Sequence, residues 1–442
     1  DAAGYRRSHR LHRPKPAAGR VPPRERPFPE TMNRLHAGRA HPGFFRRTPG
    51  LTGLLFLTVA LVLGGCFGRQ KVSELHSYQR WQTITPPKPT KPLANKLRLL
   101  IWHDYLDPDI LEFFEKTYGV ELEITYFKNN SDLKAKFAAS PDGYDLLMPS
   151  SYVVERLIKA DAIAKIDKEN IPNLANVSPV FFQAEYDREL VHSVPIFYSY
   201  LGIAFNGDYL RRLPKNFNLT SESSEENLLL FGYRALLEES RITLASALLD
   251  NGYDPNTKDP EAVRDVANEL IKASAENGIR FIADDLPRAL GRNEILIAAC
   301  WSGAAGYALS LNPAIRFVLP SGKKFLEVDS MVIPKTSPAK YTAEFFLNFL
   351  LIPEITGDCS NYSYYANTND ASRPYIEREI LIGPSYISAP AGSSIFLRDL
   401  GEAEAIYDEE WQRMHLLKEP INAKVPLRTS PRATAVKADR KH

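Results

Sequence analysis

Aromatic and acidic side chains follow the apolar segments of this 442-residue chain at several places. Trp102, Asp104 and Tyr105 come at the end of the apolar run 97–102, and Trp301 follows the run 295–300. Ligands in open α/β sheets bind beyond the carboxyl ends of the strands. Carboxylates and aromatic faces together are suited to holding a cation, because the first supply opposite charge and the second attract it by about 0.5–2 kcal/mol each.

Motifs of common enzyme classes are missing from the sequence. We find no G-x-S-x-G, no P-loop, no H-E-x-x-H and no G-x-G-x-x-G after a predicted strand. The composition is 44% hydrophobic and 24% charged, which excludes wholesale disorder, and three cysteines cannot form a disulfide scaffold. The length fits two or three average domains.

Strand and helix patterns alternate along the central part of the chain. Such interleaving predicts an α/β fold with largely parallel sheets. Pro108 is expected at the start of a helix that ends at Gly119, and Ser131 is expected to cap the next one. Strands are predicted at 97–102, 120–126, 144–148, 202–206, 279–282, 295–300, 315–319 and 325–333, and further helices at 132–139, 152–160, 241–250, 261–276 and 341–351.

The N-terminal region is predicted to be a targeting segment. Residues 1–65 carry 12 Lys/Arg and three acids, and the apolar run 51–63 is too short for a bilayer, which needs about 20 residues. The run ends in Leu-Gly-Gly-Cys, which resembles a bacterial lipobox with Cys66 as the lipid attachment site; a plain signal peptide with an incidental cysteine is the alternative. Met32 is the expected translation start, with 1–31 upstream of it.

The rest of the chain is expected to act outside the cytoplasm. Residues 66–96 are predicted to be a proline-containing tether and residues 421–442 a disordered basic tail. The net charge of +2 hides a charge of −12 for residues 66–420. An acidic body favours encounter with cationic ligands through its long-range field.

Five spaced motifs between residues 97 and 417 carry a family resemblance. They are Ile-Trp-His-Asp-Tyr at 101–105, Tyr-Asp-Leu-Leu-Met-Pro-Ser-Ser-Tyr at 144–152, Cys-Trp-Ser-Gly at 300–303, Asp-Ser-Met-Val-Ile-Pro at 329–334 and Phe-Leu-Leu-Ile-Pro at 349–353. In this order they resemble the spermidine/putrescine-binding proteins, the extracytoplasmic receptors of bacterial polyamine ABC transporters.

The resemblance implies a two-lobed periplasmic binding protein of type II, each lobe a mixed, mostly parallel sheet flanked by helices. The cleft then lies at the hinge, and hinges of this kind absorb backbone rotation at a few residues. The chain is expected to cross between the lobes near Ala204, Asp329 and Asn367. The expected lobes are 97–204 with 330–367, and 205–329 with 368–420.

The resemblance also implies the ligand-binding residues. They combine carboxylates with an aromatic box and are Trp102, Asp104, Tyr105, Ser150, Tyr152, Glu239, Trp301, Glu327, Asp329 and Tyr365. Two positions depart from the family: an acid is replaced by Ile242, and an aromatic residue by Glu327. We hypothesise that the acid at Glu327 compensates for the one lost at Ile242, which leaves the choice between spermidine and putrescine open.

Local structural roles remain as alternatives for single residues. Trp102 and Trp301 are also suited to a core, Ser150 to a helix N-cap, and Glu239 and Glu327 to structural positions. Cys300 and Cys359 are predicted to be separate buried residues, although a disulfide is chemically allowed outside the cytoplasm.

Two alternatives to a polyamine receptor stay open. One is a receptor of the same fold for ferric ion or another small solute, with Tyr364, Tyr365, His103, Asp104 and Glu239 as iron ligands. The other is a surface lipoprotein without a transport role. The main interpretation expects a monomer held at a bacterial membrane on the periplasmic or cell-surface side. It expects an ABC permease as partner, no nucleic acid, no metal, no cofactor and no catalysis.

Overall fold

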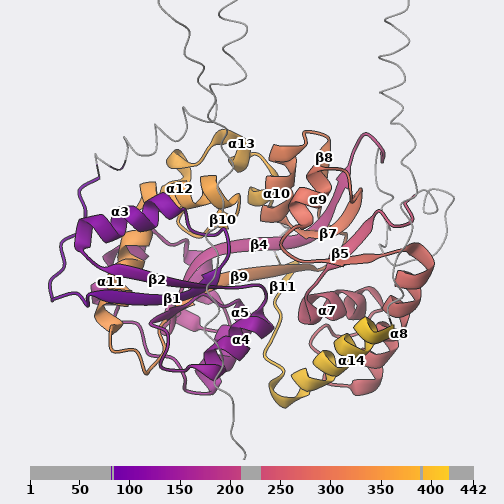
Figure 1. Cartoon of the computed structure of the whole chain (residues 1–442), viewed down its shortest axis with the longest axis horizontal. Helices are drawn as coiled ribbons and strands as arrows, with labels where there is room; N and C mark the ends of the chain where they lie inside the picture. Colours follow the sequence, from indigo (N-terminus) through magenta and orange to yellow (C-terminus); the bar gives the residue numbers. More distant parts are fainter. Residues whose placement is uncertain (1–80, 82–83, 211–229, 389–391, 418–442) are drawn as a thin grey trace, which may run out of the picture. The chain divides into compact units, whose positions relative to one another are not determined.

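The computed structural model describes residues 81, 84–210, 230–388 and 392–417, all within one compact unit that spans residues 69–442 (Figure 1). The predicted leader, the predicted lipid attachment site Cys66 and the predicted tail 421–442 lie outside the described residues. Among the described helices, none is long and apolar enough to cross a membrane.

The described strands form one mixed sheet that contains two parallel sets. In the first lobe, β1 (Lys96–Trp102) lies between β2 (Glu121–Phe127) and β3 (Leu146–Leu147) and is parallel to both. In the second lobe, β5 (Arg234–Leu237) lies between β6 (Arg280–Ile282) and β7 (Ile297–Trp301), again with parallel pairing. The α/β fold with a mixed sheet is therefore as predicted, but the sheet is not mostly parallel, because β4 (Ser193–Asn206) pairs antiparallel with each of its neighbours.

Two long antiparallel strands join the lobes. The first half of β4 (Ser193–Asn206) pairs with β9 (Lys324–Val332), and its second half pairs with β7 and with β8 (Ile315–Val318). Figure 1 shows β4 and β9 running between the β1–β2 side and the β5–β7 side. The sequence prediction located only the last five residues of β4.

The helices of the first lobe cover both faces of its sheet. On one side lie α3 (Pro108–Tyr118), α11 (Lys340–Leu350) and α12 (Pro353–Ser363), while α4 (Asn130–Ala139) and α5 (Ser151–Lys159) follow β2 and β3. Phe114 packs against Phe346 and Phe349 with ring centroids 4.8 and 5.1 Å apart, which joins α3 to α11 in the core.

Helix boundaries follow local capping chemistry. Asp107 accepts a hydrogen bond from the Asp109 amide at the start of α3, and Gly119 ends the helix with φ 66°, a conformation that favours glycine. The predicted cap Ser131 is wrong. Asn129 caps α4 instead, because its Oδ1 accepts from the Asp132 amide at 2.9 Å.

The second lobe carries separate cores on the two faces of its sheet. One face is covered by α7 (Ser240–Asp250), α8 (Pro260–Asn277) and α14 (Glu404–Leu417). The other is covered by α9 (Leu286–Gly291) and α10 (Ser302–Leu311). The remaining described elements are β10 (Ala366–Asn367), β11 (Ser394–Ile395), α13 (Arg378–Leu381) and 3-10 turns at Lys168–Asn170, Pro172–Asn176, Pro179–Gln183, Arg188–Leu190, Asp370–Tyr375, Pro384–Tyr386 and Gly401–Ala403.

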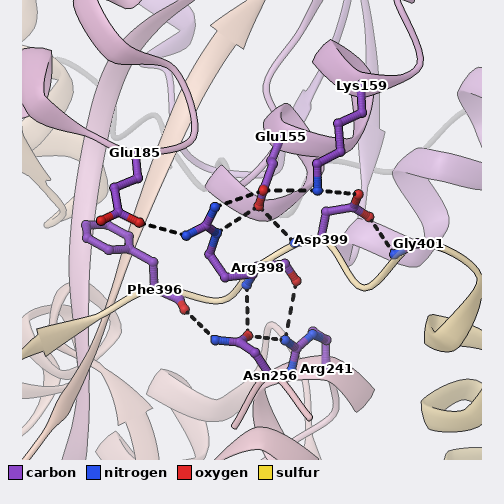
Figure 2. A network of polar contacts seen from close by, with 9 residues as sticks. All are labelled: Glu155, Lys159, Glu185, Arg241, Asn256, Phe396, Arg398, Asp399 and Gly401. Atoms are coloured by element: carbon purple, nitrogen blue, oxygen red, sulfur yellow. Dashed lines mark hydrogen bonds and ion pairs between the residues drawn. The ribbon is translucent and has the colours of Figure 1, made fainter. Parts of the chain in front are cut away.

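A polar network holds the segment that leads from β11 to α14 (Figure 2). The Arg398 guanidinium donates to both carboxylate oxygens of Glu155 on α5, each at 3.0 Å. On the other side, Asn256 Oδ1 accepts from the Arg398 amide at 2.9 Å and from the Arg241 guanidinium of α7 at 2.5 Å. This segment is therefore bonded to both lobes, and a bidentate Arg–carboxylate pair fixes its direction.

The end of the predicted tether packs against the first lobe. Trp81 is buried, stacks on Phe113 with centroids 6.0 Å apart and donates its indole N–H to Asp358 at 2.6 Å. Farther along, the Ala94 amide donates to Thr342 Oγ1 at 2.8 Å. These contacts attach residues on both sides of the proline-containing stretch to α3, α11 and α12.

Cys300 and Cys359 are both buried and both free. They lie on β7 and α12, in different lobes. The prediction that they are separate buried residues is confirmed.

Candidate functional site

A cavity of about 320 Å³ lies against the crossing strands, between the two lobes. Its walls come from the segments that follow the carboxyl ends of β1, β2, β3, β5, β6 and β7, where open α/β sheets bind their ligands. Nine of the ten predicted ligand residues line it: Trp102, Asp104, Tyr105, Ser150, Glu239, Trp301, Glu327, Asp329 and Tyr365.

The alternation of side chains along β9 decides which of its residues reach the cavity. Glu327 and Asp329 face it, while Leu326 and Val328 face a second depression on the other side of the strand. Successive side chains of a strand point to opposite faces, so the spacing of two places both carboxylates on one side.

Asp329 lies at the centre of the polar contacts in the cavity. Its Oδ1 accepts from the Ser150 hydroxyl at 2.8 Å, and its Oδ2 accepts from the Tyr105 hydroxyl at 2.9 Å. Burial raises the pKa of Asp329 to about 6, although both hydrogen bonds oppose the shift. Ser150 precedes α5 at the N-cap position but makes no capping bond, because its hydroxyl is used by Asp329.

Glu327 is bonded to the start of α5. Its Oε1 accepts from the amide and the hydroxyl of Ser151, at 2.9 and 2.5 Å. Burial and the neighbouring Asp329 raise the pKa of Glu327 to about 8. Burial therefore favours the protonated form of this carboxyl group.

Glu239 completes a group of three acids, which we call the inner carboxylates (Glu239, Glu327 and Asp329). Its Oε1 accepts from Asn130 Nδ2 at 3.2 Å, and burial raises its pKa to about 7. Among the Lys, Arg and His residues that the structure describes, none forms an ion pair with an inner carboxylate. Lys134 and Arg241 act on Glu239 through their opposite charge without forming an ion pair with it. Burying carboxylates without an ion-pair partner is unfavourable, so this end of the cavity is suited to a cationic ligand.

Aromatic rings enclose the inner carboxylates. The Tyr105 ring lies 4.8 Å from Tyr365 and 6.1 Å from Trp102, and Trp301 adds a further wall from β7. Burial raises the pKa of Tyr105 well above its usual value, so its hydroxyl remains a donor to Asp329. The Trp102 indole Nε1 is buried near Asp329 but makes no hydrogen bond of ordinary geometry among the described residues.

Gly303 is required for the position of the Tyr365 ring. A Cβ atom at Gly303 would stand 2.4 Å from Tyr365 Cγ, far inside contact distance. The Trp-Ser-Gly sequence at 301–303 therefore supplies one wall residue and the space in which another can pack.

The outer end of the cavity carries both signs of charge. Asp104 has φ 59° and is about half exposed; His103 Nδ1 lies 2.9 Å from its Oδ1. Arg288 of α9 approaches Asp104 Oδ2 at 3.6 Å from the second lobe. Lys128 and Asp284 also line this end.

Two residues named from sequence lie elsewhere. Tyr152 is buried on α5 and does not line the cavity, although burial and the charges of Glu239 and Glu327 raise its pKa well above the usual value. Tyr364 likewise lies outside the lining, with its ring stacked on Tyr307 at 5.4 Å. The adjacent tyrosines of the ferric-ion alternative therefore do not share the cavity. Within the described part of the chain, no cluster of three or more His, Cys, Asp or Glu could hold a metal ion.

A comparison with protein families identifies this architecture. A family model described as bacterial extracellular solute-binding protein matches residues 109–380, more than half of the chain. The chain belongs to this family. Solute-binding proteins bind between two lobes, and the cavity described above lies at that place in the fold.

Individual relatives and solved structures agree with the family. The spermidine/putrescine-binding periplasmic protein of Escherichia coli K12 is 29% identical over 325 residues, which cover 72% of this chain and 91% of the relative. The spermidine/putrescine ABC transporter substrate-binding protein PotD of Streptococcus pneumoniae is 25% identical, with a TM-score of 0.60 and coverage of 74% and 100%. The TpPotD lipoprotein of Treponema pallidum is 22% identical, with a TM-score of 0.64 and coverage of 72% and 99%.

Several cavity residues of this solute-binding protein were not predicted from the sequence. Asn130 and Ser151 hold Glu239 and Glu327, and Arg288, Lys128 and Asp284 line the outer end. Lys128 and Asp284 each follow a predicted strand, so the rule that named Asp104 could have found them. Asn130 and Arg288 lie on helices, and no spacing in the sequence relates them to the cavity.

The compensation of Ile242 by Glu327 stays a hypothesis. Ile242 and Glu327 line the same cavity, so an acid absent at one wall is accompanied by an acid present at another. This arrangement is what the compensation hypothesis requires.

Proposed function

We propose that this solute-binding protein is the polyamine receptor of a bacterial ABC importer. Spermidine or putrescine binds between the lobes and is delivered to the permease. The observation that carries the proposal is the set of three inner carboxylates, which are enclosed by four aromatic residues and form no ion pair with a Lys, Arg or His of the described chain. The names of the Escherichia coli and Streptococcus pneumoniae relatives support it.

The cavity has groups that suit both the ammonium groups and the methylene chain of a linear polyamine. A primary ammonium group lowers the cost of ionising the inner carboxylates, because each buried charge gains a partner. The methylene chain packs against Trp102, Tyr105, Trp301 and Tyr365, whose faces also attract ammonium groups. The net charge of −12 over residues 66–420 increases the rate of encounter with polycations.

The proposal includes the predicted ligand residues that line the cavity, and Tyr152 stays a prediction outside that lining. We also propose a monomer without enzymatic activity that is located on the periplasmic or cell-surface side. The lobe boundaries predicted from sequence, with crossings near Ala204, Asp329 and Asn367, belong to the same proposal.

The function is tested by thermal unfolding with candidate ligands. Spermidine, putrescine and cadaverine are each added at rising concentration, with butylamine and neutral amino acids as controls. Ligand at about one hundred times Kd stabilises the folded state by about 2.7 kcal/mol, so we expect a clear rise in Tm with the diamines or the triamine. Butylamine has one ammonium group and is expected to have a much smaller effect. No rise with any polyamine would overturn the proposal.

Lipid attachment is tested separately. We propose that Cys66 becomes the acylated N-terminus, and stable anchoring needs two or more acyl chains. Replacing Cys66 by serine in the full chain is expected to move the protein from the membrane fraction to the soluble fraction. The intact mass should lose the acyl groups as well. Cys359→Ser is the matched control, and equal fractionation of the Cys66→Ser and Cys359→Ser variants would refute the assignment.

A further inference from the structure

The two ends of the cavity differ in charge. At the inner end, Glu327 and Asp329 are 7% and 5% exposed and form no ion pair with a Lys, Arg or His of the described chain. At the outer end, Asp104 is already in contact with Arg288 and His103. Asp284 also lines the outer end, where the charges of His103, Lys128 and Arg288 act on it. Ionised inner carboxylates therefore attract a cation more strongly than the outer end does.

Arg288 is held at the outer end by contacts from both lobes. Its guanidinium lies 3.6 Å from Asp104 Oδ2 of the first lobe and sits over the Tyr307 ring of the second lobe, 5.4 Å from its centroid. An ion pair and a cation–π contact together favour this position of the guanidinium. The cation that faces Asp104 is thus supplied by the protein.

We propose that Arg288 is a specificity-determining residue that makes the cavity select short diamines over longer triamines. This inference rests on the proposed polyamine function and concerns the same cavity. A diamine of the putrescine class places both ammonium groups near the inner carboxylates. A triamine of the spermidine class carries its additional ammonium toward the outer end, where it meets the guanidinium.

The physical reason is repulsion between like charges combined with competition for one carboxylate. The additional ammonium group adds little binding free energy at Asp104 unless it displaces Arg288. If the guanidinium stays in place, repulsion between the two positive charges weakens binding. Juxtaposed like charges at an interface suppress the wrong partner. The selection therefore depends on the positive charge at position 288 and much less on the shape of the side chain.

The test compares affinities for putrescine and spermidine by isothermal titration calorimetry in the full chain. In the Arg288→Gln variant, we expect spermidine affinity to rise about tenfold relative to the wild-type protein and putrescine affinity to change less than about threefold. Arg288→Lys keeps the charge and is expected to keep most of the wild-type preference. Arg292→Gln is the matched control, because Arg292 follows the same helix, is about half exposed and pairs with Asp285 and Glu294 outside the cavity.

The outcomes separate this inference from the function on which it rests. If wild-type protein binds polyamines but the ratio of the two affinities is the same in Arg288→Gln, the role of Arg288 is refuted and the function stands. A ratio that changes equally in Arg292→Gln also refutes it, because general surface charge then explains the effect. If no polyamine binds to the wild-type protein, the proposed function itself fails.

Discussion

Replacing Glu327 by glutamine is expected to weaken polyamine binding by about a hundredfold and to leave the ligand-free protein at least as stable. Removing one partner of a buried, hydrogen-bonded charge pair costs about 2–5 kcal/mol of binding free energy, and 2.7 kcal/mol corresponds to a hundredfold. Glutamine keeps the oxygen that accepts from the Ser151 amide and hydroxyl. Calorimetry of the wild-type and variant proteins at pH 8 measures the change.

The stability of the ligand-free variant distinguishes a binding role from a structural one. The folded-state pKa of Glu327, about 8, lies above its ordinary value of 4.5. Its contribution to stability is therefore fully present below about pH 4.5 and is lost as the pH rises through 8. Because glutamine does not ionise, Tm of Glu327→Gln should exceed that of the wild type more at pH 8 than at pH 5.

Glu121→Gln is the surface control, since Glu121 is two-thirds exposed on β2 and pairs with Lys96. Equal binding isotherms for Glu327→Gln and Glu121→Gln would show that Glu327 does not contact the ligand. They would also remove the idea that this acid compensates for Ile242. A large loss of Tm in ligand-free Glu327→Gln would assign Glu327 a structural role.

Polyamine affinity is expected to fall by about a hundredfold or more between pH 8.5 and pH 5.5. Burial raises the pKa values of Asp329, Glu239 and Glu327 to about 6, 7 and 8, so all three gain protons over this range. Alkylammonium groups titrate near pH 10 and stay charged throughout. The ligand binds the ionised carboxylates, and protonation therefore competes with it.

The same coupling predicts that protons are released on binding. Calorimetry at pH 6.5 in buffers of different ionisation enthalpy should detect about one to two protons released per ligand, and almost none at pH 9. The Glu327→Gln variant is the control and should release fewer. Equal affinities at pH 5.5 and 8.5 without proton release would contradict the assignment of the inner carboxylates as the ligand-binding groups.

The ligand-free protein should respond to pH in the opposite direction. For each inner carboxylate the folded-state pKa lies above the unfolded one, so the stabilisation that they contribute decreases as the pH rises from about 5 to 8. Ligand binding supplies the missing cation. The ligand-induced rise in Tm is consequently expected to be larger at pH 8 than at pH 5.5.

Local chemistry explains what could be predicted of the fold. We could predict β1 from its apolar run, and both ends of α3 from its Asp-Pro start and from the glycine in the αL conformation at its end. Each of these features is determined by residues only a few positions apart. The cap of α4 failed because Asn129 and Ser131 are both good capping residues, and only the backbone path decides between them. The first half of β4 was missed because it contains Pro195 and pairs with β9, more than 120 residues away.

The residues of the candidate site were also predictable only where local sequence determines their position. Motifs that follow strand ends led to Trp102, Asp104, Tyr105 and Trp301, because strands of one parallel set bring their carboxyl ends to a common edge. Tyr152 stays a prediction: it is absent from the cavity lining, although it is close enough to Glu239 and Glu327 for their charges to add to burial in raising its pKa.

The sequence by itself determined the α/β class, the family and the aromatic and acidic residue types of the cavity, since these depend on local patterns and spaced motifs. Only the tertiary structure decided that Glu239, Glu327 and Asp329 are buried together without an ion pair among the described residues and that Arg288 faces Asp104 from the other lobe. Burial and charge pairing are properties of distances between segments far apart in the chain. A carboxyl group ionises readily in water, but its ionisation becomes unfavourable when its neighbours exclude solvent, unless a cation lies beside it.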